Sequence, residues 1–137
     1  MINKILVAID ASDHSKRAVE VATELAERLD GEVVVFHVEE KSLGRGGVFG
    51  VETDADAHTL VDAVTKQLKD AGLSARGVIQ PGLHGHTAHA IVELADAEGV
   101  GLIVLGSRGL SDLAGIMLGS VTHKLLQIAH TPVLVAR

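Results

Sequence analysis

Several residue types that support particular kinds of protein are missing or scarce in this chain. Its 137 residues include no cysteine, which excludes a disulfide framework and a thiolate metal site. Tryptophan and tyrosine are absent, and Phe36 and Phe49 are the only aromatic residues, so the core must be built from aliphatic side chains. No apolar run approaches the roughly 18 residues of a membrane-spanning helix. We therefore expect a cytoplasmic protein that does not enter a membrane.

Positive charge and two nucleotide-binding motifs are also lacking. Lys and Arg number 12 against 18 Asp and Glu, for a formal net charge of −6. Nucleic acids are bound through Lys- and Arg-rich surfaces, so this balance argues against a nucleic-acid partner. No G-x4-G-K-[ST] loop occurs, and AIDASDHS (residues 8–15) stands where a dinucleotide fold has G-x-G-x-x-G. A Walker-type NTPase and a Rossmann dehydrogenase are both disfavoured.

The chain does contain a regular alternation of strand-like and helix-like segments. Apolar residues make up 47% of it, enough for a packed core. Amphipathic segments, including residues 87–98, have apolar side chains three to four positions apart and predict helices. Apolar runs predict strands at residues 4–9, 32–38, 73–80, 102–105 and 132–136. This order predicts an α/β fold, a doubly wound five-stranded parallel sheet with helices on both faces, in a single domain spanning residues 1–137.

Capping residues and chain breakers predict where these elements begin and end. Ser12 and Thr53 are expected to start the first two helices, and Gly31 is expected to end the first. Residues 39–53 contain four glycines and no periodicity, so we predict a long loop there. Pro81-Gly82 is expected to turn the chain after the third strand.

The most informative stretch is residues 101–122, which read GLIVLGSRGLSDLAGIMLGSVT. A strand comes first and a helix begins near Ser120. Four glycines lie between or beside them: Gly106, Gly109, Gly115 and Gly119. Amides in a glycine loop and a helix N-terminus both favour anions, and Ser120 can either cap the helix or donate its hydroxyl to a phosphate. We predict a phosphate-binding loop; the alternative is an ordinary connection whose glycines only form turns.

This stretch and the start of the chain resemble the universal stress protein family. The similar segments are KILVAIDAS (4–12), LIVLGSRG (102–109), GSVTHKLL (119–126) and PVLVAR (132–137). The spacing Gly106-x2-Gly109-x9-Gly119-Ser120 is similar to the signature of the family's ATP-binding members. The resemblance covers essentially the whole chain and implies strand order 3-2-1-4-5, with the winding reversed between strands one and four. It also implies a homodimer joined through residues 132–136.

The resemblance further implies a ligand, namely ATP or another adenine nucleotide, with or without magnesium. Asp10 would accept hydrogen bonds from the ribose hydroxyls, Ala8 would lie beside the adenosine, and Val38 would line the adenine pocket. The residues implied around the phosphates are Gly106, Arg108, Gly109, Gly119, Ser120 and Val121. Two of these roles have simpler alternatives. Asp10 could only cap a turn, and Arg108 could be a solvated loop residue instead of a phosphate ligand.

Three functions compete for these patterns. The first is a nucleotide-binding regulatory protein of the stress response with little or no hydrolysis. The second is a slow ATPase, and the third is a ligand-free dimeric interaction module. The glycine signature favours the first two, and the lack of a P-loop lysine and of a water-activating group favours the first. We predict no catalytic residue, and we expect Asp112 to be a solvated turn residue.

The histidines offer a competing signal for a metal site. His84, His86 and His89 cluster in PGLHGHTAH, and imidazoles at such a spacing can bind zinc or nickel. No carboxylate or cysteine within the cluster completes a four-ligand set, so we predict no metal site. His37 alternates within a strand and is expected to be a packed core residue.

Overall fold

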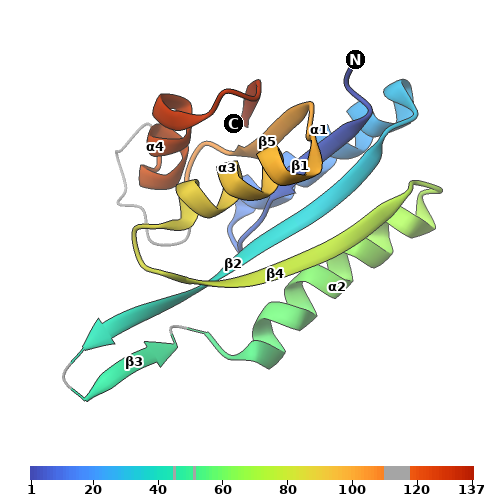
Figure 1. The fold of residues 1–137 in the computed structure, drawn as a ribbon. Coiled ribbons are helices and arrows are strands. Elements are labelled where there is room, and N and C mark those ends of the chain that lie inside the picture. Colours follow the sequence, from blue (N-terminus) through green and yellow to red (C-terminus); the bar gives the residue numbers. More distant parts are fainter. Residues whose placement is uncertain (45, 51, 110–117) are drawn as a thin grey trace.

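The structure is a computed structural model that describes residues 1–44, 46–50, 52–109 and 118–137 (Figure 1). Its elements alternate along the chain much as the sequence predicts. In order they are β1 (Lys4–Ala8), α1 (Asp13–Leu29), β2 (Glu32–Gly44), β3 (Gly47–Gly50), α2 (Asp54–Asp70), β4 (Ala75–Leu83), α3 (Thr87–Glu98), β5 (Leu102–Gly106), α4 (Ser120–Ile128) and β6 (Val133–Ala136). Among the described helices, none is long and apolar enough to cross a membrane.

The parallel sheet confirms the predicted doubly wound architecture. Its strands run β4-β2-β1-β5-β6, and every neighbouring pair in this order is parallel. Counted along the chain, these parallel strands have the order 3-2-1-4-5. The winding therefore reverses between β1 and β5, as expected. In such a sheet, ligands bind beyond the carboxyl ends of the strands at this reversal.

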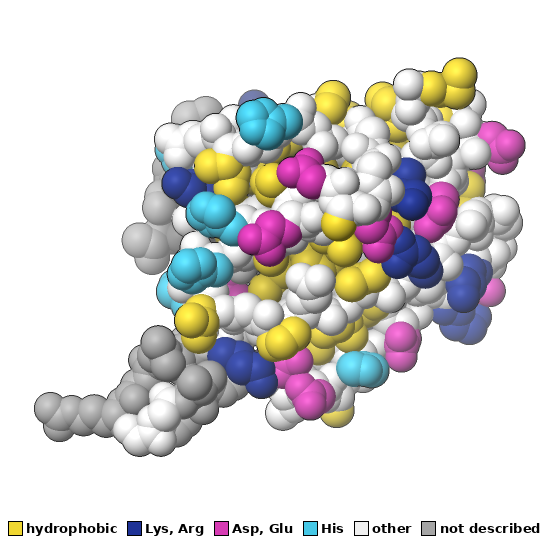
Figure 2. Space-filling view, viewed as in Figure 1, with side chains coloured by type: hydrophobic (Ala, Val, Ile, Leu, Met, Phe, Trp, Pro, Cys, Tyr) yellow, Lys and Arg dark blue, Asp and Glu magenta, His cyan; other side chains and the backbone are white. Residues whose placement is uncertain are grey.

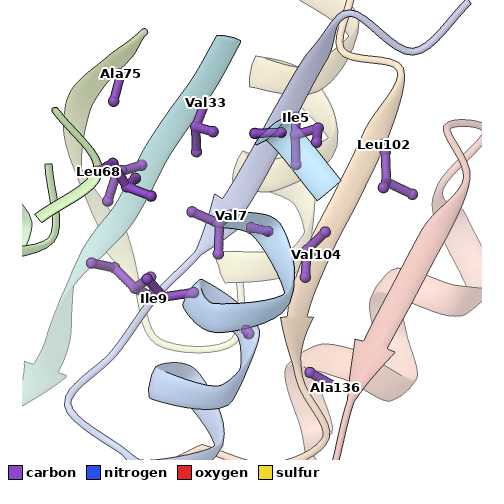
Figure 3. Packing of buried hydrophobic residues seen from close by; sticks show 14 of the residues in the cluster. Ile5, Val7, Ile9, Val33, Leu68, Ala75, Leu102, Val104 and Ala136 are labelled. Atoms are coloured by element: carbon purple, nitrogen blue, oxygen red, sulfur yellow. The ribbon is translucent and has the colours of Figure 1, made fainter. Parts of the chain in front are cut away.

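Two apolar layers hold the helices on opposite faces of the sheet. Alternate residues of a strand point to opposite faces, so Val7 belongs to one layer and Leu6 to the other. Helices α1 and α2 pack on the first layer, and α3 and α4 on the second. Figure 3 shows the first layer, with aliphatic side chains such as Val7, Val33 and Val104 on neighbouring strands and Leu68 on α2. Among the described residues, the other large fully buried side chains besides Phe36 are isoleucine, leucine and valine, which confirms a largely aliphatic core.

The predicted helix starts are confirmed, while one helix end is not. Ser12 caps α1, with its Oγ accepting a hydrogen bond from the Ser15 amide at 3.1 Å. Thr53 caps α2 through a reciprocal capping box with Asp56. Helix α1 ends at Leu29, and its C-cap residue Asp30 has a left-handed φ of 50°. The expectation that Gly31 would provide this stop is wrong, because aspartate also tolerates that conformation.

The long loop predicted at residues 39–53 is wrong over most of its length. Strand β2 continues to Gly44 and pairs antiparallel with β3, with Ser42 opposite Phe49. Two glycines with positive φ, Gly46 and Gly47, make the turn possible. Pairing between two backbone segments supplies the hydrogen bonds of this hairpin, so it leaves no side-chain periodicity to detect.

The turn predicted at Pro81-Gly82 is also wrong, because β4 continues through both residues to Leu83. Pro81 lies opposite Glu39 of β2 in the parallel register. Strand β4 is at the edge of the parallel sheet, and an edge strand tolerates proline where the missing N–H would face outward. Because β4 extends to Leu83, helix α3 begins next to the second half of β2, where Thr87 contacts Glu40.

Candidate functional site

A cavity of about 310 Å³ lies at the winding reversal, between the ends of β1 and β5. Its walls are formed by residues of β1, β2, β5 and all four described helices, and by the segments after β1, β3 and β5. The lining includes every site residue predicted from the sequence: Ala8, Asp10, Val38, Gly106, Arg108, Gly109, Gly119, Ser120 and Val121. Residues far apart in sequence are thus brought to one place. Their binding roles remain predictions.

The glycine-loop end of the cavity is formed by the end of β5 and the start of α4. The Gly119 amide donates to the Ser107 carbonyl at 2.6 Å. The Thr122 hydroxyl donates to the Gly106 carbonyl at 2.8 Å. These bonds hold the N-terminus of α4 against β5, and a helix N-terminus carries partial positive charge.

Gly119 is the N-cap of α4 and Ser120 is the first helical residue. The capping alternative for Ser120 is therefore wrong, because the backbone leaves the helical conformation one residue earlier, with φ −67° and ψ 158° at Gly119. The other alternative, a hydroxyl directed to phosphate, stays a prediction. Asp112 and Gly115 lie outside the described residues.

Gly106 has a packing role that is independent of any ligand. A Cβ added at this position would lie 2.7 Å from the backbone carbon of His14, in the first turn of α1. Glycine is therefore needed for β5 to end so close to α1. The following residue, Ser107, is buried, and its Oγ lies 3.3 Å from His14 Nδ1. Part of the glycine signature thus has a structural cause.

Asp10 lines the cavity and lies two residues after the end of β1. Its Oδ1 accepts a hydrogen bond from the Ser12 amide at 2.8 Å, and its own amide donates to Ser15 Oγ at 2.9 Å. The structure thus shows the turn-forming role that was the simpler alternative. A carboxylate has several acceptor positions, so this role is compatible with a second one toward a ligand.

The lining also includes apolar side chains and a carboxylate, and the sequence interpretation missed the carboxylate. Val38, Ile91 and Leu105 contribute apolar side chains. Glu40 contributes the carboxylate, with Oε1 accepting from Thr87 Oγ1 at 2.7 Å. The available signal was strand periodicity, because Glu40 is two residues after Val38 and shares its face of β2.

His37 is buried, as predicted, but it also forms part of the cavity wall. Its Nδ1 lies 2.8 Å from the Ile9 carbonyl oxygen, and its Nε2 lies 2.5 Å from Glu52 Oε1. The contact with Glu52 joins the core of β2 to the segment between β3 and α2. Sequence reasoning placed Glu52 in a long loop and could not anticipate this partner.

The three clustered histidines do not converge in the structure. His84 Nδ1 lies 3.1 Å from Glu40 Oε2, and the rings of His86 and His89 have centroids 6.1 Å apart. On the face of the molecule drawn in Figure 2, histidine side chains (cyan) lie among acidic ones (magenta). Across the described ranges, no three His, Cys, Asp or Glu side chains are grouped as a metal site requires.

Glu39 lies on the opposite face of β2 from Glu40 and is only 6% exposed. A side-chain hydrogen bond with Asp54 raises the pKa of Glu39 above its ordinary value of 4.5, and burial and the nearby Asp54 charge raise it further. Lys41, whose Nζ lies 3.7 Å from Glu39 Oε1, opposes the shift. Folding therefore favours the protonated form of this carboxyl group.

The raised pKa of Glu39 predicts a pH-dependent effect of Glu39→Gln. The favourable contribution of protonated Glu39 is full below pH 4.5 and is lost as pH rises through the raised folded-state value. Glutamine cannot ionise, so the variant should melt at a higher temperature than the wild type at pH 7, and the difference should shrink toward pH 4.5. Circular dichroism melts at both pH values measure this. The control is Glu93→Gln, which changes an exposed residue and should not show this pH-dependent difference. An increase in melting temperature for Glu39→Gln that is equal at both pH values would refute the prediction.

Comparison with known proteins places the chain in a family. The model of the universal stress protein family matches residues 1–137. Universal stress protein YxiE of Bacillus subtilis is 36% identical over 149 residues, covering 100% of each chain. Universal stress protein MJ0577 of Methanocaldococcus jannaschii is 26% identical over 158 residues, covering 100% of this chain and 96% of that one.

Solved structures agree with this assignment. The structure of MJ0577 superimposes with a TM-score of 0.82 over 99% of this chain and 96% of that one. A universal stress protein in complex with cAMP is 26% identical and has a TM-score of 0.71, over 99% of this chain and 97% of that one. Because the family model and the 36% identity both extend over the whole chain, this chain belongs to the universal stress protein family.

Proposed function

We propose that this protein binds an adenine nucleotide, foremost ATP, and acts as a cytoplasmic regulatory protein of the stress response. The observation that carries the proposal is the convergence of all the predicted site residues on one cavity at the winding reversal. The relative that was solved in complex with cAMP, 26% identical and similar over nearly its whole length, supports the same class of ligand.

The order of chemical groups along the cavity supports a nucleotide. The strands β5, β1 and β2 are neighbours in the sheet, about 4.8 Å apart each. The glycine loop and the α4 N-terminus follow β5 and favour phosphate. Asp10 follows β1 and offers acceptors for hydroxyl groups, as acidic residues do for the ribose in dinucleotide sites. Val38 on β2, together with Ile91 of α3 and Leu105 of β5, offers apolar side chains for contact with the base. This is the order of phosphate, ribose and base in a nucleotide.

Charge along the cavity matches the same orientation. Within the described part of the lining, Arg108 is the one Lys or Arg side chain, and it lies at the glycine-loop end. The carboxylates of Glu40 and Glu52 lie at the β2 end. A phosphate is therefore attracted to one end and disfavoured at the other. Magnesium, where it takes part, would enter on the phosphates with Ser120 or Asp10 nearby, a common arrangement for this ion.

Titration calorimetry of the wild-type protein with ATP, in the presence of magnesium, tests the proposal. One saturable site per chain is expected. Titration with inorganic triphosphate is the control and should give weaker binding, because it reaches only the glycine-loop end. The absence of saturable ATP binding up to millimolar concentrations would contradict the proposal.

We further propose that two copies form a homodimer through β6. This strand pairs with β5 on one side, and among the described strands it has no partner on the other. Val133, Leu134 and Val135 are partly buried apolar residues, and a free apolar strand edge is a template for pairing.

The dimer proposal predicts that a charged and kinked β6 abolishes association. The double variant Val133→Asp with Leu134→Pro should be monomeric, because aspartate disfavours an apolar contact and proline removes a backbone donor. Multi-angle light scattering at micromolar concentration measures the mass of each form. Leu126→Asp, which changes an exposed leucine of α4, is the matched control and should remain dimeric. A wild-type protein that is monomeric under these conditions would rule the dimer out.

A further inference from the structure

Gly82 of β4 lies beside a residue of the cavity wall and leaves it room. Strand β4 runs alongside β2 (Figure 1), with Gly82 opposite Glu40 in the parallel register. A Cβ added at Gly82 would lie 2.8 Å from Cγ1 of Val38, whereas non-bonded carbon atoms prefer to be about 3.5–4.0 Å apart. The Val38 methyl group therefore occupies space that a side chain at position 82 would need.

The backbone does not require glycine at position 82. The φ angle of Gly82 lies outside the left-handed region, so Gly82→Ala introduces no backbone strain. Among the described residues beyond its chain neighbours, Val38 Cγ1 is the one heavy atom within 4 Å of the added Cβ. Gly82 is not itself a lining residue, so an effect of this substitution on the cavity must pass through Val38.

Val38 has room to yield toward the cavity. It lines the cavity and is just 6% exposed. It belongs to the same apolar layer as Ile91 and Leu105, which also line the cavity. Because the interior of a protein is close-packed, the cavity offers the free space into which a displaced methyl group can move. Gly82→Ala would thus narrow the cavity on the side formed by β2.

We infer that Gly82 is a positioning residue for the base of the nucleotide, because it lets Val38 stand back from the cavity. The inference rests on the proposed function, in which the base lies against Val38 and the phosphates lie at the glycine loop. One methylene group too many in an apolar pocket changes affinity by about 10–200-fold. Because a displaced valine can also change its rotamer, we expect a loss near the lower limit, about tenfold for ATP.

Titration calorimetry with ATP and with inorganic triphosphate tests the inference. Gly82→Ala should bind ATP about tenfold less tightly than the wild type and triphosphate equally tightly, since triphosphate lacks a base. Val38→Ala removes the methyl group with which the new side chain would clash. Adding Gly82→Ala to Val38→Ala should therefore cause no further loss of ATP affinity, and this non-additivity is expected of residues that act through one contact.

Gly77→Ala is the matched control on the same strand. Its Cβ would lie 2.4 Å from Cγ1 of Val61, which is buried on α2 and is not part of the cavity lining. The control thus creates a clash with a valine methyl group outside the cavity. It should lower the melting temperature measured by circular dichroism, but leave the ATP affinity of the folded protein as in the wild type.

The outcomes separate this inference from the proposed function. Unchanged ATP affinity in folded Gly82→Ala, or an equal loss in folded Gly77→Ala, would overturn the role of Gly82 while leaving nucleotide binding in place. If Gly82→Ala does not fold, the comparison of Val38→Ala with the double variant decides, because the clash is absent there. A further loss of ATP affinity in the double variant would overturn the inference. If the wild-type protein does not bind ATP, the proposed function itself is wrong.

Discussion

Replacing Gly119 by valine is expected to lower the affinity for ATP by about a hundredfold, while the protein still folds. Gly119 is buried at the N-cap of α4, where the backbone must approach the phosphates. Its φ of −67° and ψ of 158° are extended values that valine readily adopts. The added side chain, however, occupies space beside the amides that would bind phosphate. Losing one or two charge-assisted hydrogen bonds, at about 1.5–3 kcal/mol each, accounts for the expected loss.

Calorimetric titration of folded Gly119→Val with ATP measures this effect. Gly31→Ala is a suitable control, because its Cβ would lie 3.4 Å from the Asn3 carbonyl oxygen, an ordinary contact remote from the cavity. Gly106→Val would be a poor test, because its clash with His14 would disturb the fold. If well-folded Gly119→Val binds ATP as tightly as the wild type, the phosphates do not bind at this helix N-terminus.

Turnover of ATP is expected to fall far below the range of about 1–1000 per second that is typical of enzymes. Phosphoryl transfer needs a positioned water, neutralised phosphate charge and usually a metal held by a carboxylate or hydroxyl. Within the described lining, Glu40 is engaged by Thr87 and Glu52 by His37. Asp10 accepts a hydrogen bond from the Ser12 amide. We infer that the protein holds ATP without hydrolysing it appreciably, so that the bound nucleotide acts as a long-lived signal.

A phosphate-release assay on highly purified protein measures this turnover. Gly119→Val serves as the background control, because it should lack the nucleotide and any activity that depends on it. A wild-type rate within the ordinary enzymatic range that disappears in Gly119→Val would make this protein an ATPase and would show that the regulatory interpretation is wrong.

The elements that sequence predicts well are those defined by local patterns. The period of apolar residues locates the parallel strands and all the described helices, and the helix predicted from about residue 87 to 98 agrees with α3. Ser12 and Thr53 cap their helices because capping depends on a side chain and an amide three residues away. The strand order, in contrast, came from the family resemblance, because pairing between distant strands leaves no mark in either strand alone.

The features that sequence misses depend on distant partners or on backbone geometry. The contacts of Glu40 with His84 and Thr87 join residues 44 and 47 positions apart, so no spacing rule could find them. The β2–β3 hairpin and the passage of β4 through Pro81 depend on which backbone lies alongside. The shift of the α4 N-cap from Ser120 to Gly119 is set by backbone angles. These omissions all lie on the side of the cavity formed by β2 or at the start of α4.

We propose above all that an adenine nucleotide binds at the carboxyl ends of β1 and β5 and against Val38 of β2. Amide chemical shifts of isotope-labelled protein, followed by nuclear magnetic resonance during titration with ATP, test both the binding and its location. The largest changes are expected at Asp10, Val38, Gly109 and Gly119, with little change at Leu68, which is buried on α2 and does not line the cavity. Changes that cluster away from the cavity, or a spectrum that stays the same at saturating ATP, would contradict the claim.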